Sequence, residues 1–289
     1  INRYAVFTMP EELIGFFKKH IDYLTEHSVD ADKRRYAVKE EAPRHYIDID
    51  VYGDKPFEVM PRKWNDAVEK FTEDTLIAYG IVPWHIQTIY NRLVNAFSDK
   101  DVEYILRNAS DLGHYVADTH VPLHTSLNYN GQLTGQKGIH AFWESRLPEL
   151  FSGNYDFLVG TANYRYSVLD VAWETIEQSH GALDSVLDFD KQLTATFERD
   201  KQYSYEKRGQ KTIKQKSAEF STAYHVMLDG MVERRLRLSI KTVGDLWYSA
   251  WVDAGQPVLE GMKESDIPFV EEIKIDHKIT SDDARGHQH

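Results

Sequence analysis

The 289-residue chain contains no cysteine. Disulfide bonds and thiolate ligands are therefore excluded, and any metal ion must be held by histidine, aspartate or glutamate side chains. The chain also lacks an apolar run of about eighteen residues, so we expect no membrane-spanning helix. Its first ten residues, INRYAVFTMP, lack the layout of a signal peptide. These absences leave the cellular compartment open.

Basic residues are scarce. The sequence has 34 lysines and arginines against 46 aspartates and glutamates, a net charge of −12. This charge opposes extended nonspecific contact with nucleic-acid phosphates unless metal ions or a local basic patch change the field. A small anionic ester or a short polyanion remains compatible with it. The hydrophobic content of 42% is sufficient for a substantial core.

Helical periodicity runs through most of the chain. Thr8 as N-cap and Pro10 in the first turn predict a helix over 10–28. The charged segment 30–56 reads as an ordered loop. Further helices are expected at 62–80, 83–99, 101–120, 140–151, 166–193 and 212–253. The prediction is one all-α, multi-helix bundle domain over residues 1–255, followed by a polar C-terminal tail, 256–289.

Histidines and carboxylates are concentrated between residues 111 and 150. His114 and Asp118 are four residues apart on one predicted helix, and His140 and Glu144 repeat this spacing on the next. Each pair therefore projects from one helix face and can hold one ion. His124 lies between the pairs, just after Pro122. Imidazole and carboxylate ligands without thiolate suit zinc, with iron or manganese as chemical alternatives.

A second group of candidates lies upstream. His45 is close in sequence to Asp48 and Asp50, and Asp30 and Asp32 precede it. Taken alone, these are solvated loop charges. They become ligands only if this loop folds over the bundle.

Together these motifs resemble the zinc-dependent phospholipase C and single-strand nuclease superfamily, which comprises bacterial phospholipases C and the P-one and S-one nucleases. The shared pattern is a histidine, an aspartate four later, a histidine six after that within "VPLH", and a later histidine followed four residues on by a carboxylate. The loop "HYIDID" and the closing helix "RRLRLSIKTVGDLWYSAW" are similar to the family's as well. The resemblance covers residues 1–253 and implies the family's phospholipase C/P-one nuclease fold.

The resemblance implies a ligand set. One zinc would be held by His45, His114, Asp118 and an upstream aspartate, which is Asp32 if Arg35 is aligned with the pattern Asp-x-x-Arg and Asp30 if spacing is weighted. The second zinc would be held by His124, His140 and Glu144. The family's third zinc uses an N-terminal tryptophan, a histidine and the shared aspartate. That site would need residues upstream of Ile1.

Some positions depart from the family pattern. Ala117 and Val121 replace the usual glycine and glutamine, and His120 has no family role. Trp143 resembles the nucleases, whereas Glu144 and the absence of cysteine resemble the phospholipases. The sequence therefore leaves open whether the substrate is a single-stranded nucleic acid, a nucleotide or a phospholipid. The aromatic candidates for contacting such a substrate are Tyr46, Trp84, Tyr129 and Phe142.

The implied activity is phosphodiester hydrolysis by a metal-activated hydroxide. Asp32 or Asp30 would also orient the nucleophile, and Arg35 would stabilise charge on phosphorus. By resemblance the protein is exported, to the periplasm or outside the cell. We predict no protein partner.

Two alternatives remain. A non-catalytic, metal-stabilised helical binding protein would use the same ligands. A di-iron carboxylate oxidoreductase needs two Glu-x-x-His pairs, and the sequence offers Glu177 with His180.

Overall fold

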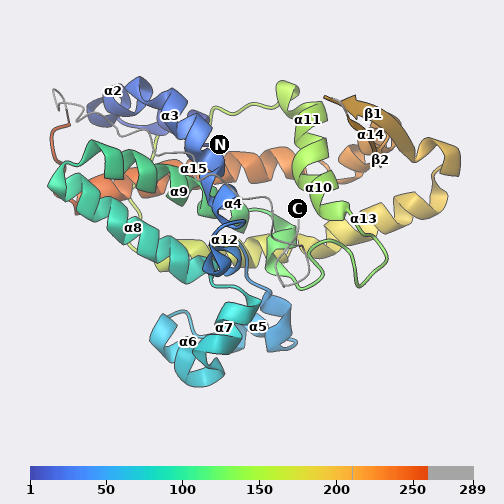
Figure 1. The fold of residues 1–289 in the computed structure, drawn as a ribbon, viewed down its shortest axis with the longest axis horizontal. Coiled ribbons are helices and arrows are strands. Elements are labelled where there is room, and N and C mark those ends of the chain that lie inside the picture. Colours follow the sequence, from blue (N-terminus) through green and yellow to red (C-terminus); the bar gives the residue numbers. More distant parts are fainter. Residues whose placement is uncertain (210, 260–289) are drawn as a thin grey trace.

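The computed structural model of the chain describes residues 1–209 and 211–259 (Figure 1). The described chain is mostly helical, which confirms the predicted all-α class at that level. It also contains one short antiparallel hairpin, β1 (Tyr203–Arg208) and β2 (Lys211–Lys216).

Four long helices form the body of the molecule: α8 (Val82–Asp99), α9 (Val102–Thr119), α12 (Val168–His180) and α15 (Met231–Asp253). α8 ends at Lys100 in a left-handed conformation, and the Asp101 side chain caps α9 by accepting a hydrogen bond from the Tyr104 N–H. This tight connection makes α8 and α9 antiparallel neighbours. The indole of Trp247 on α15 donates to the Ala109 carbonyl of α9, so α15 lies directly against α9 (Figure 1).

The N-terminal segment is a series of short helices: α1 (Asn2–Ala5), η1 (Val6–Thr8), α2 (Glu11–Lys19), α3 (Ile21–Glu26), η2 (His27–Val29) and α4 (Asp30–Arg34). The predicted single helix over 10–28 is thus interrupted at His20. Thr8 is not the N-cap residue of α2, because Pro10 holds that position, and the Thr8 hydroxyl donates to the Ala5 carbonyl. Phe17 of α2 stacks on Trp247, which fixes this segment to α15.

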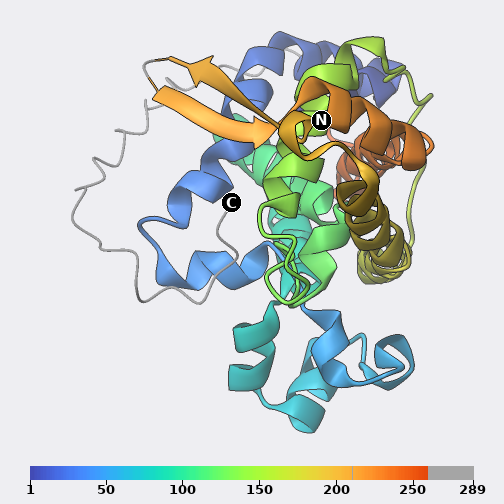
Figure 2. The same ribbon diagram turned by 90° about the vertical axis from the view of Figure 1, so that its right-hand side faces the viewer.

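The predicted loop 30–56 is mostly made of short helical turns: α4, η3 (Lys39–Arg44) and η4 (Ile49–Tyr52). α5 (Pro56–Val59), α6 (Trp64–Phe71) and α7 (Glu73–Tyr79) follow and lie to one side of the body (Figures 1 and 2). The helix predicted over 62–80 is therefore two helices. They are divided at Thr72, whose φ of 69° no α-helix allows.

The remaining elements are η5 (Pro122–Thr125), α10 (Ile139–Ala141), a π-helical turn η6 (Phe142–Arg146), α11 (Leu147–Phe151), η7 (Ser152–Asn154), α13 (Leu183–Thr196), η8 (Arg199–Lys201) and α14 (Ala218–Met227). The predicted helix over 166–193 is divided into α12 and α13. The prediction of one helix over 212–253 was wrong. Its first residues form β2, and positive φ values at Asp229 and Gly230 separate α14 from α15.

The buried apolar side chains form two clusters. The larger cluster unites α2, α8, α9, α12 and α15. The smaller cluster unites η5, η6, α13 and α14. The clusters come closest in sequence near the C-terminal end of α9, where Val116 belongs to the larger one and Val121 to the smaller. The predicted ligands lie at this junction.

The predicted C-terminal tail begins in contact with the body. The Trp251 indole donates to the Pro257 carbonyl, and Leu259 is buried in the larger cluster. The rest of the predicted tail, from residue 260, lies outside the described residues. Among the helices that the structure describes, none is both long and apolar enough to cross a membrane.

Candidate metal centre

Helix α9 supplies the middle of the site. His114 and Asp118 lie one turn apart on its inner face, as the helical period requires. The turn before them is in close contact with α1, since a Cβ atom added at Gly113 would lie 2.0 Å from the Asn2 side-chain oxygen. Only glycine allows this approach.

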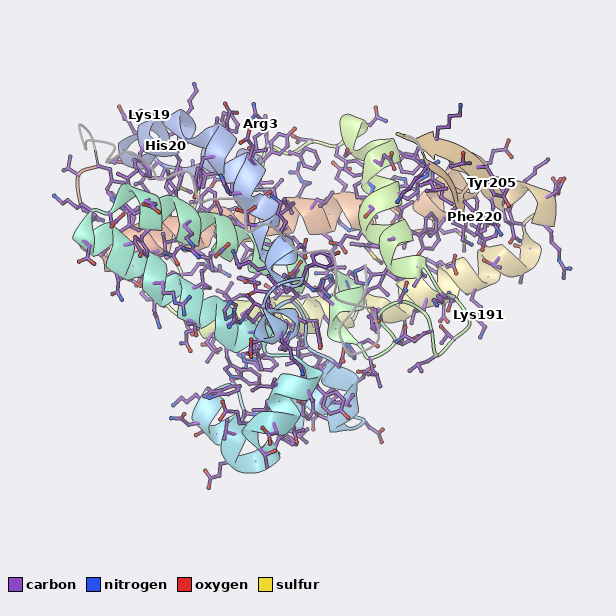
Figure 3. The ribbon with its side chains drawn as sticks, viewed as in Figure 1. Arg3, Lys19, His20, Lys191, Tyr205 and Phe220 are labelled. Carbon is purple, nitrogen blue, oxygen red and sulfur yellow. The ribbon has the colours of Figure 1, made fainter. Side chains whose placement is uncertain are left out.

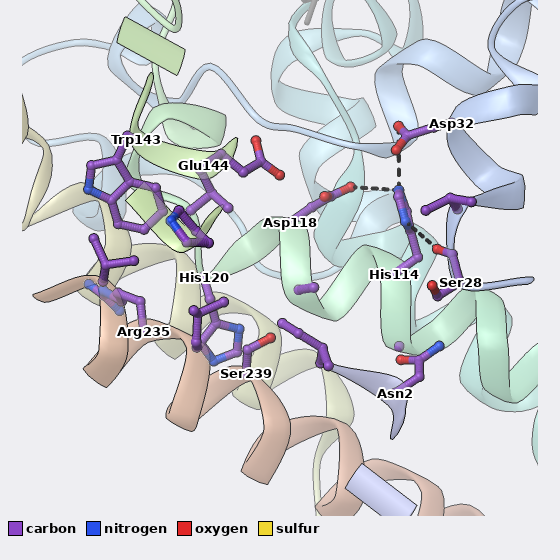
Figure 4. A pocket seen from close by; sticks show the side chains of 18 residues that line it. Asn2, Ser28, Asp32, His114, Asp118, His120, Trp143, Glu144, Arg235 and Ser239 are labelled. Atoms are coloured by element: carbon purple, nitrogen blue, oxygen red, sulfur yellow. Dashed lines mark hydrogen bonds and ion pairs between the residues drawn. The ribbon is translucent and has the colours of Figure 1, made fainter. Parts of the chain in front are cut away.

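The first cluster brings together Asp32, His45, His114 and Asp118. His45 Nδ1 lies 2.9 Å from Asp118 Oδ2 and 3.1 Å from His114 Nε2. His114 Nε2 lies 3.4 Å from the same Asp118 oxygen. Asp32 Oδ1 completes the group at 3.7 Å from His45 Nδ1. It lies 3.6 Å from His114 Nε2, a pair that Figure 4 shows. The η3 segment therefore does fold over α9 and carry His45 to it.

Neighbouring groups orient the two rings of this cluster. His114 Nδ1 donates to the Ser28 carbonyl at 2.8 Å, which leaves Nε2 to face the cluster (Figure 4). His45 Nε2 faces the buried Glu41 carboxylate at 3.7 Å. Glu41 in turn accepts a hydrogen bond from the Tyr115 hydroxyl and pairs with Arg44. Such partners fix the tautomer and angle of a metal-binding imidazole.

The second cluster consists of His124, His140 and Glu144. His140 Nε2 is 3.1 Å from His124 Nε2 and 2.8 Å from Glu144 Oε2, and His124 Nε2 is 3.5 Å from that oxygen. His124 Nδ1 donates to the main-chain carbonyl of His45 at 2.7 Å. This bond ties the two clusters together through one residue.

The spacing of these atoms fits a cation. A tetrahedral ion with ligand bonds of about 2.1 Å separates its ligand atoms by roughly 3.4 Å. The ligand-atom separations given above run from 2.8 Å to 3.7 Å. Asp32, His45 and His114 form one group that could hold a metal ion, and His124, His140 and Glu144 form another. The second, with three protein ligands, matches the three-ligand pattern of catalytic zinc.

The electrostatics point to the same conclusion. Burial opposes ionisation of Asp118, yet the facing His114 and His124 rings lower the pKa of this carboxyl to about 2. Burial likewise opposes a charge on His124, yet Asp118 and Glu144 raise the pKa of His124 to about 9. The pKa of Glu144 is also lowered by these imidazoles against the effect of burial. The ionised Asp118 and Glu144 thus hold a proton on His124, which a bound cation would displace.

Both clusters open onto one cavity of about 270 Å³. Asp32, His114 and Asp118 line it on one side and Glu144 on the other (Figure 4). Trp143 and Arg235 form its far wall, and Ile1 lines it as well. A small substrate can therefore contact residues of both clusters at once.

The structure separates the two upstream aspartates. Asp32 lies in the first cluster, whereas Asp30 pairs with His27 at 2.6 Å and with Lys33 at 2.8 Å. Arg35 lies beside the first cluster, 3.8 Å from Asp32.

His120 stays outside both clusters. Its Nδ1 donates to the Val116 carbonyl, and its Nε2 faces the Thr242 hydroxyl. Asp50 organises the loop after η5 by accepting from Ser126 and from the Leu127 N–H.

The remaining candidates have other surroundings. Trp84 packs between Trp64 and Trp173 in the core, and Tyr46 and Phe142 are buried. Tyr129 lies beside His140, with ring centroids 6.1 Å apart. Glu177 is exposed, and the His180 ring bonds with Thr125, so this pair does not provide a di-iron motif.

Two residues at the site were missed in the sequence. Glu41 precedes His45 by four residues, the same spacing that identified the other pairs, and this spacing was a usable signal. Arg235 is a buried cation in the cavity, and burial together with Arg234 lowers its pKa to about 10. In the sequence, nothing distinguishes Arg235 from the other arginines of residues 234–237.

Comparison with protein-family models and with curated proteins finds no match. The protein is therefore characterised by its fold and its site alone. It is mostly helical and has two adjacent His/carboxylate clusters that open onto a common cavity.

Proposed function

We propose that the protein is a zinc-dependent phosphodiester hydrolase of the phospholipase C/P-one nuclease type. The observation that carries the proposal is the convergence of six side chains into two groups that could each hold a metal ion. Asp118 lies beside the first group, and both groups border one cavity. The segments that carry these side chains span residues 32 to 144. Chance packing does not gather ionisable groups in the interior unless their charges are compensated, because isolated buried charges are costly.

Each cluster would hold one ion. Asp32, His45, His114 and Asp118 are the ligands proposed for the first, and His124, His140 and Glu144 those for the second. Zinc bound there supplies a Lewis acid for phosphoryl oxygens and lowers the pKa of water to near neutrality. The local field of the clusters would also offset the acidic charge of the chain at the point where an anionic substrate binds.

In this proposal, residues in and around the clusters also act on the attacking water and on the phosphoryl group. The Asp32 side chain is 42% exposed, so it can accept a proton or a hydrogen bond from an attacking water. Arg35 lies beside it and can neutralise charge on the phosphoryl group. Arg235 presents a second cation from the opposite wall of the cavity.

The test combines metal analysis with turnover. Protein loaded with zinc and freed of excess ion should retain about two zinc ions per chain and should hydrolyse bis-para-nitrophenyl phosphate. Zinc retained without turnover would instead favour the non-catalytic binding protein. Preferential retention of iron, with an oxo-bridge absorption band, would favour the oxidoreductase.

A further inference from the structure

The β1–β2 hairpin, residues 203–216, differs in charge from the rest of the molecule. Five of its residues are basic and one is acidic, in a chain of net charge −12. Lys207, Lys211 and Lys214 are exposed. We call this segment the hairpin arm; Figure 2 shows it projecting from the body.

Aromatic side chains accompany the lysines. Tyr205 is 74% exposed and Tyr203 42% exposed. The strand register places Tyr205 opposite Lys214, and directly opposed residues of two strands share one face of a hairpin. Lys214 also lies over the Tyr203 ring at 4.2 Å. One face of the arm thus alternates flat rings with positive charges.

The arm is fixed to the candidate metal centre. Glu206, on the other face, forms a two-pronged salt bridge with the buried Arg146, with N–O distances of 2.5 Å and 3.1 Å. Arg146 ends the η6 turn that carries Glu144 two residues earlier. At the base of the arm Lys216 pairs with Asp190 and lies 3.8 Å from the Phe220 ring centroid. Tyr205 and Phe220 mark the free and anchored parts in Figure 3.

We propose that the hairpin arm is a docking surface for the backbone and bases of a single-stranded polynucleotide. The proposal rests on the proposed function, because it assigns a polymeric phosphodiester to that site. Lysines provide charge for successive phosphates, and exposed tyrosines stack on unpaired bases, which a duplex does not present. An anionic bilayer is the less suitable partner. The turn sequence 207–212, KRGQKT, has no large apolar side chain to insert into lipid.

Two triple variants of equal charge test the proposal. The arm variant is Lys207→Gln, Lys211→Gln and Lys214→Gln. The control variant is Lys18→Gln, Lys63→Gln and Lys191→Gln, three exposed lysines on other parts of the surface. Each set changes the net charge from −12 to −15. Binding is measured on the zinc-loaded protein with a fluorescent, phosphorothioate-linked oligothymidylate of about 12 nucleotides, over a series of salt concentrations.

The arm variant should bind the oligonucleotide roughly tenfold more weakly at low salt, and its slope of log affinity against log salt should fall by roughly 2. The control variant should match the wild type. Tyr205→Ala should weaken binding by roughly tenfold, and Tyr205→Phe should restore it. Equal binding by the arm and control variants would overturn the proposal. The proposal would also be overturned if the arm variant lost binding to phosphatidylserine vesicles but still bound the oligonucleotide as the wild type does.

A small substrate separates this inference from the proposed function. Neither triple variant touches the cavity, so both should hydrolyse bis-para-nitrophenyl phosphate at the wild-type rate. If that hydrolysis is present while arm and control variants bind the oligonucleotide alike, the arm assignment fails and the hydrolase stands. If no variant hydrolyses the small diester but the arm variant alone loses the oligonucleotide, the hydrolase fails and the arm still binds polynucleotide.

Discussion

Asp118 faces imidazoles of both clusters. It contacts His45 and His114 of the first cluster, and its charge raises the pKa of His124 in the second. Asp118→Asn keeps the shape but removes the charge. Because loss of groups that merely support a ligand already costs 10- to 100-fold, we expect this variant to lose zinc and to lower diesterase turnover by more than about 100-fold. Zinc content and turnover, measured on the same preparation, check this.

Asp30 provides the matched control for Asp32. The two carboxylates are two residues apart, but Asp30 is held by His27 and Lys33, whereas Asp32 faces His45 and His114. Asp32→Asn should remove zinc from the first cluster and reduce turnover. Asp30→Asn should leave both the zinc content and the turnover close to the wild-type values, because it removes only the ion pairs with His27 and Lys33. The reverse result, with zinc lost only in Asp30→Asn, would contradict the ligand assignment.

His85 makes stability depend on pH. Its ring is buried against Tyr115, and burial together with nearby Arg44 lowers the pKa of His85 from 6.5 to about 3. The folded protein keeps this ring neutral, whereas the unfolded chain binds a proton below pH 6.5. The stabilisation is therefore fully present above pH 6.5 and is lost as pH falls toward 3. At pH 4.5 the loss amounts to roughly 2 to 3 kcal/mol.

Urea unfolding at pH 7 and pH 4.5, with chelator present at both, measures this loss. His85→Phe retains an aromatic ring beside Tyr115 but does not titrate. The difference in unfolding free energy between the two pH values should be smaller in the variant by roughly the same 2 to 3 kcal/mol. An identical drop in both proteins would show that His85 is not the group responsible.

At the residue scale, sequence spacing predicted which candidate site residues share one face of a regular helix. His114 and Asp118 were found because α9 is regular over the turn that carries them. The choice between Asp30 and Asp32 could not be made in this way. It depends on which of the two carboxylates forms ion pairs with its neighbours. His27 and Lys33 form ion pairs with Asp30 only in the folded α4 region.

At the element scale, α9 depends on its contact with α1. Asn2 is buried and donates to the carbonyls of Leu24 and Ser110. A methyl group at Gly113 would occupy the position of its side chain. Gly113→Ala should therefore lower the unfolding free energy by about 1 to 3 kcal/mol, although alanine is the better helix former.

Gly15→Ala, in α2, is the matched control. An added Cβ there meets no atom within 4 Å. The same substitution should raise the unfolding free energy by up to about 1 kcal/mol through helix propensity alone. Denaturant unfolding of the two variants checks the opposite signs. A destabilised Gly15→Ala would mean that backbone freedom, and not the contact with Asn2, decides the effect at both positions.

Element boundaries were the least predictable part of the fold. Apolar periodicity continues across Thr72 and across Asp229–Gly230, and only the positive φ values in the folded chain end the helices there. Residues 212–216 were assigned to a helix. They form β2 instead because Lys216 and Glu206 anchor the hairpin to residues of α13 and η6, contacts that a local pattern does not contain.

At the scale of the whole molecule, the candidate site depends on long-range folding. His45 meets His114 across 69 residues of sequence, and its carbonyl accepts from His124 across 79. The order of these residues along the chain predicted the ligand set only through a family resemblance. Their convergence depends on η3 packing over α9 at the junction of the two hydrophobic clusters.

Because the ligands come from separate segments, bound ions would cross-link the fold. A ligand that binds only the folded state adds about 2.7 kcal/mol at a free concentration 100-fold above its dissociation constant, so two zinc sites together add about 5 kcal/mol. Chelation should lower the midpoint of thermal unfolding, and added zinc should restore it. In Asp118→Asn the shift between chelator and zinc should be smaller, since the first cluster has lost one of its two carboxylates. If chelator and zinc give the wild type the same unfolding curve, the clusters do not hold ions that stabilise the fold.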